Sequence, residues 1–370
     1  MNQTVIETQR ILEGLVSMMS CRLQEVHLED HYQVVEELGS GTFGSVLMAK
    51  DKATEKIAAL KFLKKSQTSL ESFLVEHYTS FFLSSHPNII GSYGVAFQTM
   101  DYYVFVQEWS PVGDLFDMIE DRVGIPEVKA KRCAVQIASA LDFMDSKGLV
   151  HCDVKPENVL LFDEDCHCVK VNDFGLTCLK GTPIRARSGT SSYMSPELCR
   201  PREGDTLHAV SSLDAWAFGV LLFCVISGYF PWEEAVPEDS GFNSFVDWVD
   251  SSVAGPPPMW EGFTTEALHM FRQLLALNPN ERINALEIMK FVDFPWKAEN
   301  HTDCGMEGLQ AVLKKPNYDS RSDGAMSSYS DCVLSDVDTS SCISGTLSMS
   351  SRSLYFEERN NSNSINFTLS

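Results

Sequence analysis

The sequence predicts an α+β protein with two lobes: a small lobe with an antiparallel β-sheet and one helix, and a larger, mainly helical lobe. Short β-prone runs separated by turns fill residues 32–108, and helical spacing of apolar residues is typical of residues 109–297. The stretch from 214 to 226 is apolar all round, which indicates a helix buried inside a domain. A strand-rich first part followed by a helix-rich second part implies the α+β class.

The composition sets the size of the core and the kind of partner. With 370 residues, 44% of them hydrophobic and 10% aromatic, the chain can bury one large core or two smaller ones. Its formal net charge of -22 argues against nucleic acid or an anionic membrane as a partner, because phosphate-rich surfaces attract an excess of Lys and Arg. A basic peptide is a more natural partner, although an acidic surface can also simply confer solubility.

The cysteines and the apolar runs bear on the cellular compartment. The 11 cysteines form no CxxC pair, and Cys166-His167-Cys168 lacks a second pair of ligands at zinc-finger spacing. The N-terminal residues contain no apolar signal core with a cleavage site, and the longest apolar run, 215–226, is too short to span a bilayer. We therefore expect a soluble, cytoplasmic protein with reduced thiols. A monomer is our further expectation.

The first elements follow from periodicity. Residues 1–31 are expected to form an amphipathic helical extension, because apolar residues are interleaved there with Glu and Gln at helical spacing. Three β-prone runs come next, YQVVEEL (32–38), SVLMAK (45–50) and KIAALKF (56–62), and they predict an antiparallel meander. The apolar positions of the N-terminal helix are Ile11, Leu12, Leu15, Val16, Met18 and Met19.

The later elements are predicted from capping signals and spacing. The capping-box pattern Thr68-Ser69-Leu70-Glu71 announces a helix, and two more strands are expected around 88–97 and 101–109. A further helix should end near Gly148, a plausible C-cap. Residues 298–370 are rich in Ser, Asp, Asn and Gly, so a disordered tail is expected. The predicted helix faces are Phe73, Leu74, His77 and Phe81 for the first helix, and Ala134, Ile137, Leu141 and Met144 for the second.

A glycine-rich segment lies in the first predicted turn. Glycines at such positions let a hairpin backbone approach a polyphosphate and offer its amides. Alone the pattern is weak evidence, since a dinucleotide-binding fingerprint has similar spacing. That alternative requires a helix after the turn, however, and here a strand follows. The segment consists of Leu38, Gly39, Ser40, Gly41, Thr42, Phe43, Gly44, Ser45 and Val46.

Two charged residues are expected to form an ion pair that offsets the cost of burying each charge. Lys61 lies in a predicted strand, where a lone lysine is normally a solvated edge residue. Glu76 lies among aromatic neighbours in the next helix, where an unpaired carboxylate is costly to bury. An ion pair between Lys61 and Glu76 would satisfy both charges and hold the ammonium toward a phosphate.

The segments HCDVKPEN (151–158) and VNDFG (171–175) carry the remaining chemistry. Asp153 could orient or deprotonate an attacking hydroxyl, and Lys155 could stabilise a transferring phosphoryl group, while Asn158 and Asp173 could bind magnesium through hard oxygen ligands. Each residue alone could be an ordinary turn former. Chance does not supply the order, however: glycine hairpin, strand lysine, helix glutamate, DxKxxN loop, DFG and then SPE at 195–197.

In this order the motifs resemble those of eukaryotic protein kinases over roughly residues 32–297, with a first lobe of 32–108 and a second of 109–297. The stretches QEWSPVGDLFDMI, KPENVLLFDEDC and WAFGVLLFCVISGYFPWE are similar to the group called SH3-binding-domain kinases. The resemblance implies a bilobal kinase fold, ATP and Mg²⁺ as cofactors, and protein substrates with Ser or Thr acceptors. It also implies a buried ion pair between Glu197 and Arg282, and support of the catalytic loop by Asp214.

The same resemblance assigns the nucleotide site. Val46, Ala59 and Leu160 would sandwich adenine, although an apolar floor is also their ordinary structural role. Gln107 would be the gatekeeper and Glu108 would begin the hinge. Serine/threonine specificity follows from Lys155, with Thr190 placed to contact both Lys155 and Asp153.

The sequence departs from the family next to the catalytic aspartate, where Cys152 replaces the usual arginine. That arginine commonly pairs with a phosphate on the activation segment, and the usual phosphorylated position is Ala186 here. We therefore expect activity without phosphorylation at this position, with Thr182 and Ser188 as remaining candidates. Cys152 is expected to be an inert apolar filler rather than a redox sensor.

Partners and rival functions are less well marked. SH3 partners are doubtful because the tail contains no PxxP motif, and the serine-rich tail suits either phosphorylation or a plain solvated end. Asp114 and Glu157 could face basic residues of a substrate peptide. The main rival is a pseudokinase scaffold. It is disfavoured by four intact motif residues: Lys61, Asp153, Asn158 and Asp173. A kinase of small metabolites is disfavoured by SGTSSYMSPE, which resembles a peptide-docking segment.

Overall fold

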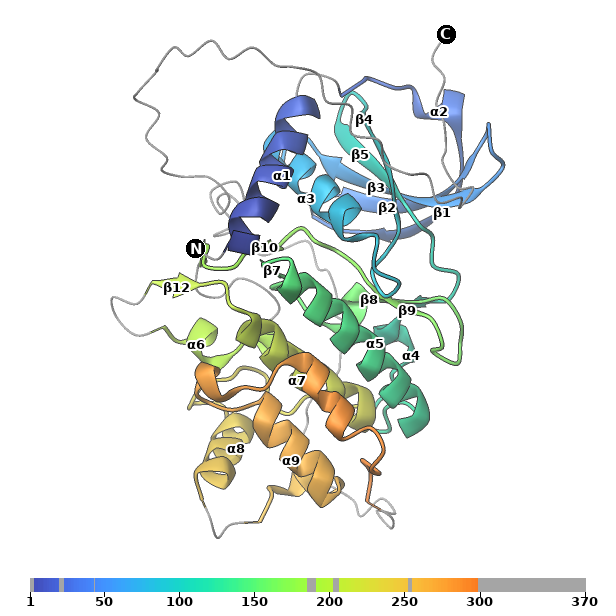
Figure 1. The fold of residues 1–370 in the computed structure, drawn as a ribbon. Helices are drawn as coiled ribbons and strands as arrows, with labels where there is room; N and C mark the ends of the chain where they lie inside the picture. Colours follow the sequence, from blue (N-terminus) through green and yellow to red (C-terminus); the bar gives the residue numbers. More distant parts are fainter. Residues whose placement is uncertain are drawn as a thin grey trace, which may run out of the picture.

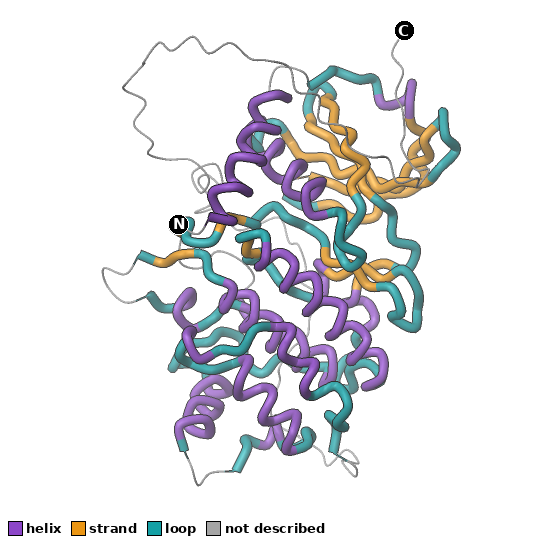
Figure 2. Tube along the Cα trace, in the orientation of Figure 1, coloured by secondary structure: helices purple, strands orange, loops and turns teal. Residues whose placement is uncertain are grey.

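The computed structural model describes residues 3–19, 23–42, 44–184, 191–201, 206–251 and 255–298. Figure 1 and Figure 2 show a small lobe dominated by one twisted sheet above a larger lobe of packed helices. The predicted α+β, two-lobed fold is confirmed. The sheet contains β1 (Tyr32–Ser40), β2 (Gly44–Asp51), β3 (Ile57–Lys64), β4 (Ser92–Gln98) and β5 (Tyr102–Gln107) in the order β1-β2-β3-β5-β4.

All neighbours in this sheet are antiparallel, so the predicted meander of the first three strands is confirmed. The register places Val46 of β2 opposite Lys61 of β3, and Ala59 of β3 opposite Gln107 of β5. Ala59 and Leu60 are buried on the two faces of β3, because alternate side chains of a strand point to opposite sides. Lys61 is therefore positioned by a strand that is well packed on both faces.

Helix α3 (Leu70–Leu83) lies against the sheet in the small lobe. Its N-cap is Ser69, whose side chain accepts a hydrogen bond from the Ser72 amide at 3.0 Å. The helix therefore starts one residue later than a box built on Thr68 would place it, and Ser72 rather than Glu71 stands at the third helical position. Phe73, Leu74 and His77 are buried as predicted, but Phe81 is 44% exposed, so its assignment to the buried face is wrong.

The large lobe is built around α7 (Ser211–Ser227), whose residues 213–226 are all buried. This confirms the predicted central helix. Helix α5 (Glu127–Ser146) packs on it, and Gly148 with φ +73° follows its end as predicted. The remaining helices are α4 (Leu115–Met118), α6 (Pro196–Cys199), α8 (Ser240–Asp250) and α9 (Thr265–Leu274).

Short strands organise the loops between the lobes. A three-stranded sheet joins β6 (Gly113–Asp114), β8 (Val159–Leu161) and β9 (Val169–Val171), which bracket the catalytic-loop and DFG segments. Strand β7 (Leu149–Val150) pairs with β10 (Cys178–Leu179), and β11 (Pro183–Ile184) pairs with β12 (Leu207–His208).

Helix α1 (Gln3–Met19) runs alongside α3 and reaches down to the region of β7 and β10 (Figure 1). It buries Val5 and Leu12, and the Thr8 hydroxyl donates to the Lys147 carbonyl oxygen at 2.7 Å. A short helix, α2 (Leu28–His31), precedes β1. In the part of the chain that the structure describes, no helix is both long and apolar enough to cross a membrane. The tail predicted to be disordered lies outside the described residues apart from Ala298.

Candidate active site

The ammonium of Lys61 is the point where three distant segments meet. Lys61 Nζ lies 2.7 Å from Glu76 Oε1 on α3 and 2.9 Å from Asp173 Oδ1 in the DFG segment. The predicted Lys61–Glu76 pair is therefore present, with an additional carboxylate. Burial alone would lower the pKa of Lys61, but Asp173 and Glu76 together raise it well above its ordinary value. The lysine is held as a cation.

Asp173 is positioned by an unusual backbone conformation. Its φ is +64°, in the left-handed region that a non-glycine residue seldom adopts. The carboxylate accepts a hydrogen bond from the Gly175 amide at 3.3 Å as well as the contact from Lys61. Burial would raise the pKa of Asp173, but Lys61 and the Gly175 amide lower it to about 2. Asp173 is therefore a stable anion, suited to binding a cation.

Asp153 lies in a compact polar loop with the other residues of its motif. Its Oδ2 accepts hydrogen bonds from Lys155 Nζ at 2.7 Å and from Asn158 Nδ2 at 2.9 Å. Asn158 Nδ2 also donates to the Asp153 carbonyl oxygen at 2.8 Å. Burial opposes the charge of Lys155, but Asp153 more than compensates and raises the pKa of Lys155. The structure brings Asp153, Lys155 and Asn158 together.

The backbone of this loop is fixed by buried Asp214 of α7. The amides of His151 and Cys152 donate to its two carboxylate oxygens at 2.8 and 2.9 Å. The Asn172 amide donates to the Asn158 carbonyl oxygen at 2.8 Å, which ties the DFG segment to the catalytic loop. Asp214 thus makes the backbone contacts that the resemblance implied. The linking role of Asn172 was not predicted, because nothing in the sequence distinguishes it from an ordinary loop asparagine.

The glycine-rich hairpin connects β1 and β2. The Gly41 amide donates to the Gly44 carbonyl oxygen at 2.8 Å, closing the turn. A Cβ on Gly44 would lie 1.7 Å from the Phe62 carbonyl oxygen, whereas Gly39 and Gly41 face open space. Gly44 is therefore required by packing on β3, and Gly39 and Gly41 leave the backbone approachable. Leu38, Gly39, Ser40, Gly41 and Thr42 are exposed, Ser45 and Val46 are half-buried, and Phe43 lies outside the described residues.

The residues assigned to the nucleotide base lie on the sheet and on β8. Ala59 and Gln107 are buried opposite each other, and Leu160 is half-buried on β8. Gln107 Nε2 donates to Asn172 Oδ1 at 3.4 Å, so this side chain is also connected to the DFG segment.

Glu108 has a structural contact that the sequence did not suggest. Its Oε2 lies 2.6 Å from Lys170 Nζ and accepts from the Gly91 amide at 3.0 Å. The carboxylate therefore fastens the end of β5 to β9. No spacing rule links Glu108 to Lys170, since the two residues meet only through the fold.

Arg282 and Glu197 form the ion pair expected from the resemblance. Arg282 Nη1 and Nη2 lie 2.6 and 2.7 Å from the two carboxylate oxygens of Glu197, and the Arg282 side chain is fully buried. This fork anchors the SPE segment to the large lobe. Thr190, the other residue expected near Asp153 and Lys155, lies outside the described residues.

The residues present fit a magnesium ion held together with phosphates. Asp173 offers a carboxylate. Asn158 turns its amide nitrogen to Asp153, which leaves its side-chain oxygen available as a metal ligand. Magnesium is commonly bound by one or two such protein oxygens plus substrate phosphates. In the described ranges no group of three or more His, Cys, Asp or Glu side chains is arranged to hold a metal by itself.

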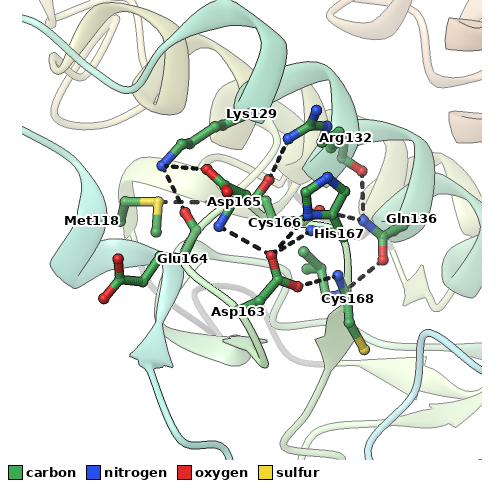
Figure 3. A network of polar contacts seen from close by, with 11 residues as sticks. Met118, Lys129, Arg132, Gln136, Asp163, Glu164, Asp165, Cys166, His167 and Cys168 are labelled. Atoms are coloured by element: carbon green, nitrogen blue, oxygen red, sulfur yellow. Dashed lines mark hydrogen bonds and ion pairs between the residues drawn. The ribbon is translucent and has the colours of Figure 1, made fainter.

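The Cys166-His167-Cys168 segment is part of a structural turn. Figure 3 shows the Asp163 carboxylate accepting from the amides of this turn, including His167 at 3.0 Å and Cys168 at 2.8 Å. The His167 amide lowers the pKa of Asp163; burial opposes this effect, and the Cys168 amide adds to it. The turn is fastened to α5, from which Gln136 donates to the Cys166 carbonyl oxygen at 2.9 Å.

Comparison with known proteins agrees with this geometry. Residues 32–294 match the protein kinase domain family. The chain is 45% identical over 296 residues to serine/threonine-protein kinase SBK1 of Danio rerio, covering 80% of this chain and 77% of that protein. It is 48% identical over 262 residues to SBK1 of Mus musculus, covering 71% and 63%, and 36% identical over 294 residues to serine/threonine-protein kinase SBK2 of Homo sapiens, covering 79% and 84%. The chain therefore belongs to the protein kinase family, as a serine/threonine-protein kinase of the SH3-binding-domain kinase group.

Proposed function

We propose that this kinase transfers the terminal phosphoryl group of ATP to Ser or Thr hydroxyls of proteins, using Asp153, Lys155 and Lys61. The observation that carries the proposal is the meeting of Lys61, Glu76 and Asp173 within 2.9 Å, beside a loop that presents Asp153. These residues come from four separate segments of the chain. Such convergence suits phosphoryl transfer, in which positioning and electrostatic stabilisation supply most of the catalysis.

Each side chain has a distinct part in this proposal. Lys61, held by Glu76, anchors a phosphate through its fixed positive charge. Asp153 orients the acceptor hydroxyl and takes its proton, while Lys155 stabilises negative charge on the transferring group. Asn158 and Asp173 would hold magnesium, which supplies charge neutralisation on the phosphates when bound. Val46, Ala59 and Leu160 would pack on the adenine, and the hairpin amides would face the phosphates.

The test is phosphoryl transfer from labelled ATP to generic basic proteins and to the kinase itself. Asp153→Asn keeps the shape of the side chain but removes its basicity, so activity should fall by about 100-fold or more. Asp121→Asn, at a side chain that is 62% exposed, is the matched control and should behave as wild type. Equal incorporation by wild type and Asp153→Asn would contradict the proposal and favour contamination or a scaffold function.

We also propose that activity does not depend on phosphorylation at the usual activation-segment position. The supporting observation is that Cys152, where the family has arginine, has sulfur and carbonyl neighbours: Cys178 Sγ at 3.6 Å and the Val150 oxygen at 3.7 Å. Neither would attract a phosphate. Ala186, which carries no hydroxyl, lies outside the described residues. Phosphatase treatment should leave activity unchanged, and loss of activity with a critical phosphate mapped to residues 182–188 would overturn this proposal.

A preference for basic peptides is proposed from the acidic residues beside the catalytic loop. Glu157 Oε2 is buried and, among the described residues, has no hydrogen-bond partner. Burial, together with the negative charge of Asp114, raises the pKa of Glu157. A cationic substrate side chain would relieve both effects. A peptide array should show selection for Arg or Lys near the acceptor, weakened in Glu157→Gln, and an array without such selection would remove the proposal.

A further inference from the structure

Two thiols lie in contact between the catalytic loop and the activation segment. Cys152 Sγ is 3.6 Å from Cys178 Sγ, although the residues are 26 positions apart in the chain. The pairing of β7 with β10 places Cys178 opposite Val150, two residues before Cys152. The Cys152 amide is held by Asp214, and its φ of +66° turns the side chain into this position. The contact is therefore specified by the fold on both sides.

The Cys178 side of the pair is open to small solutes. Both thiols are half-buried, but Cys152 lines a cavity of about 30 Å³, whereas Cys178 lines one of about 530 Å³ that is bounded by α1, α3 and β10. A cavity of this size admits water and molecules as small as hydrogen peroxide. The hydrogen bond between the two thiols and the burial of Cys152 raise the pKa of Cys152. Cys178 is therefore the thiol that an oxidant meets first, and Cys152 is the one placed to resolve it.

In place of the inert role that the sequence suggested for Cys152, we propose that Cys152 and Cys178 are a modification site at which hydrogen peroxide forms an intramolecular disulfide that displaces the start of the activation segment. In the first step the Cys178 sulfur attacks peroxide, giving a sulfenic acid and one water. In the second step the Cys152 sulfur attacks that sulfenic acid, forming the S–S bond and releasing a second water. Two thiols thus lose two electrons and two protons, and one peroxide becomes two waters.

The bond would move one partner more than the other. A disulfide is about 2.05 Å long, so sulfurs that lie 3.6 Å apart must approach by about 1.5 Å. Cys152 is held through its amide by Asp214, whereas Cys178 lies on a strand of two residues. The movement therefore falls on the segment that follows Asp173. Since misplacement of about 1 Å can lower a catalytic rate 100-fold, the oxidised kinase should lose activity, a consequence that rests on the function proposed above.

The chain offers an internal control for this chemistry. Cys133 and Cys166 are a second pair of interacting thiols, because the neighbouring Cys166 raises the pKa of Cys133, but both residues have no exposed surface. Cys166 lies in the turn drawn in Figure 3, where its Sγ donates to Met118 Sδ at 3.7 Å. Contact alone would predict oxidation of both pairs. Contact combined with access to peroxide predicts oxidation of Cys152 and Cys178 only.

The experiment treats the full-length protein with hydrogen peroxide, blocks remaining thiols with N-ethylmaleimide and maps linked peptides by mass spectrometry. Wild type should yield a peptide pair joined through Cys152 and Cys178, while Cys133 and Cys166 stay reduced. Hydrogen exchange of residues 173–184 should change on oxidation, and activity should fall at least about tenfold and return with dithiothreitol. Cys178→Ser should keep its basal activity and show none of these responses to peroxide.

Three results would overturn the proposal. Separate alkylation of Cys152 and Cys178 after peroxide would show that the bond does not form, and so would linkage of Cys178 to a different cysteine. Linkage with unchanged hydrogen exchange would show that the bond displaces nothing. Peptide mapping and hydrogen exchange do not use kinase activity, so a reduced wild type without activity would contradict the proposed function while leaving this test intact.

Discussion

The side chain of Arg282 shows how strongly one buried charge depends on one partner. It is fully buried and donates two hydrogen bonds to the Glu197 carboxylate. Its Cζ lies over the Trp216 ring, 4.8 Å from the ring centroid. In Glu197→Gln the guanidinium would keep its charge but lose its counter-charge, which destabilises a buried pair by about 3 kcal/mol or more. Urea unfolding of the variant should therefore show a large loss in the free energy of unfolding.

An exposed ion pair in the same lobe provides the comparison. Arg200 Nη1 lies 2.6 Å from Glu238 Oε1, but their side chains are 62% and 67% exposed. Water already solvates both charges, so Glu238→Gln should leave the unfolding midpoint unchanged within error. If Glu197→Gln and Glu238→Gln lowered stability alike, burial would not be what makes the Arg282 pair important.

At the scale of single residues, the sequence predicted contacts where an isolated charge would be costly. Lys61 and Glu76 each needed a partner, and the order of motifs indicated which one. Glu108 and Lys170 carried no such signal, because an exposed position is an equally good expectation for either. The neighbourhood of Cys152 and Cys178 was equally hidden. It depends on the pairing of β7 with β10, two strands too short to be recognised from a pattern.

Helix α3 carries a histidine that should make stability depend on pH. His77 is fully buried between aromatic rings, neither of its ring nitrogens has a hydrogen-bond partner among the described residues, and burial lowers its pKa to about 4. Below pH 6.5 the unfolded chain binds a proton that the folded chain refuses, so stability falls as the pH drops toward 4. Between pH 7 and pH 5 this effect should lower the free energy of unfolding by about 2 kcal/mol.

The variant His77→Phe removes the titrating group and keeps an aromatic ring. Its loss of stability between pH 7 and pH 5, measured by urea unfolding at both values, should be smaller than that of wild type by this amount. An equal loss in the two proteins would mean that His77 takes up a proton in the folded state. Above pH 7 the two proteins should show the same slope with pH.

The end of α5 depends on a glycine for two separate reasons. Gly148 has φ +73°, and a Cβ there would lie 2.8 Å from Val5 Cγ2 of α1. Gly181 has φ +85° with nothing within 4 Å of such a Cβ, so it isolates the backbone effect. Gly181→Ala should lower the free energy of unfolding by about 1 kcal/mol, and Gly148→Ala by clearly more. Adding Val5→Ala to Gly148→Ala should recover part of the difference in thermal unfolding, and no recovery would contradict the steric explanation.

At the scale of elements, periodicity and turn residues predicted the five strands of the small-lobe sheet and the helices α3, α5 and α7, because these elements bury continuous apolar faces. The helix start at Ser69 was less well predicted, since two adjacent hydroxyl residues, Thr68 and Ser69, can each cap a helix. The exposure of Phe81 was missed for a related reason. Helical spacing puts it on the same face as Phe73 and His77, and its ring lies against Gly94 of β4, but Phe81 is in the last turn and remains 44% exposed.

On the scale of the molecule, α1 joins parts that belong to different lobes. It packs along α3 in the small lobe, and its Thr8 hydroxyl reaches the Lys147 carbonyl oxygen at the end of α5. The order of motifs in the sequence predicted two lobes and the segments that meet between them. It could not predict which surface α1 would cover, because an amphipathic face of one helix fits many apolar surfaces equally well.

The packing of α1 can be tested by one buried and one exposed residue of the same helix. Leu12 is 8% exposed and lines the cavity between α1 and α3, whereas Ile11 is 41% exposed. Leu12→Ala should cost about 2 kcal/mol, near the lower end for such truncations, because the cavity already exists and little new void is created. Ile11→Ala should cost much less, and hydrogen exchange in α3 should rise only in Leu12→Ala. Equal behaviour of the two variants would mean that α1 does not brace α3, and that Glu76 is held in place by the sheet alone.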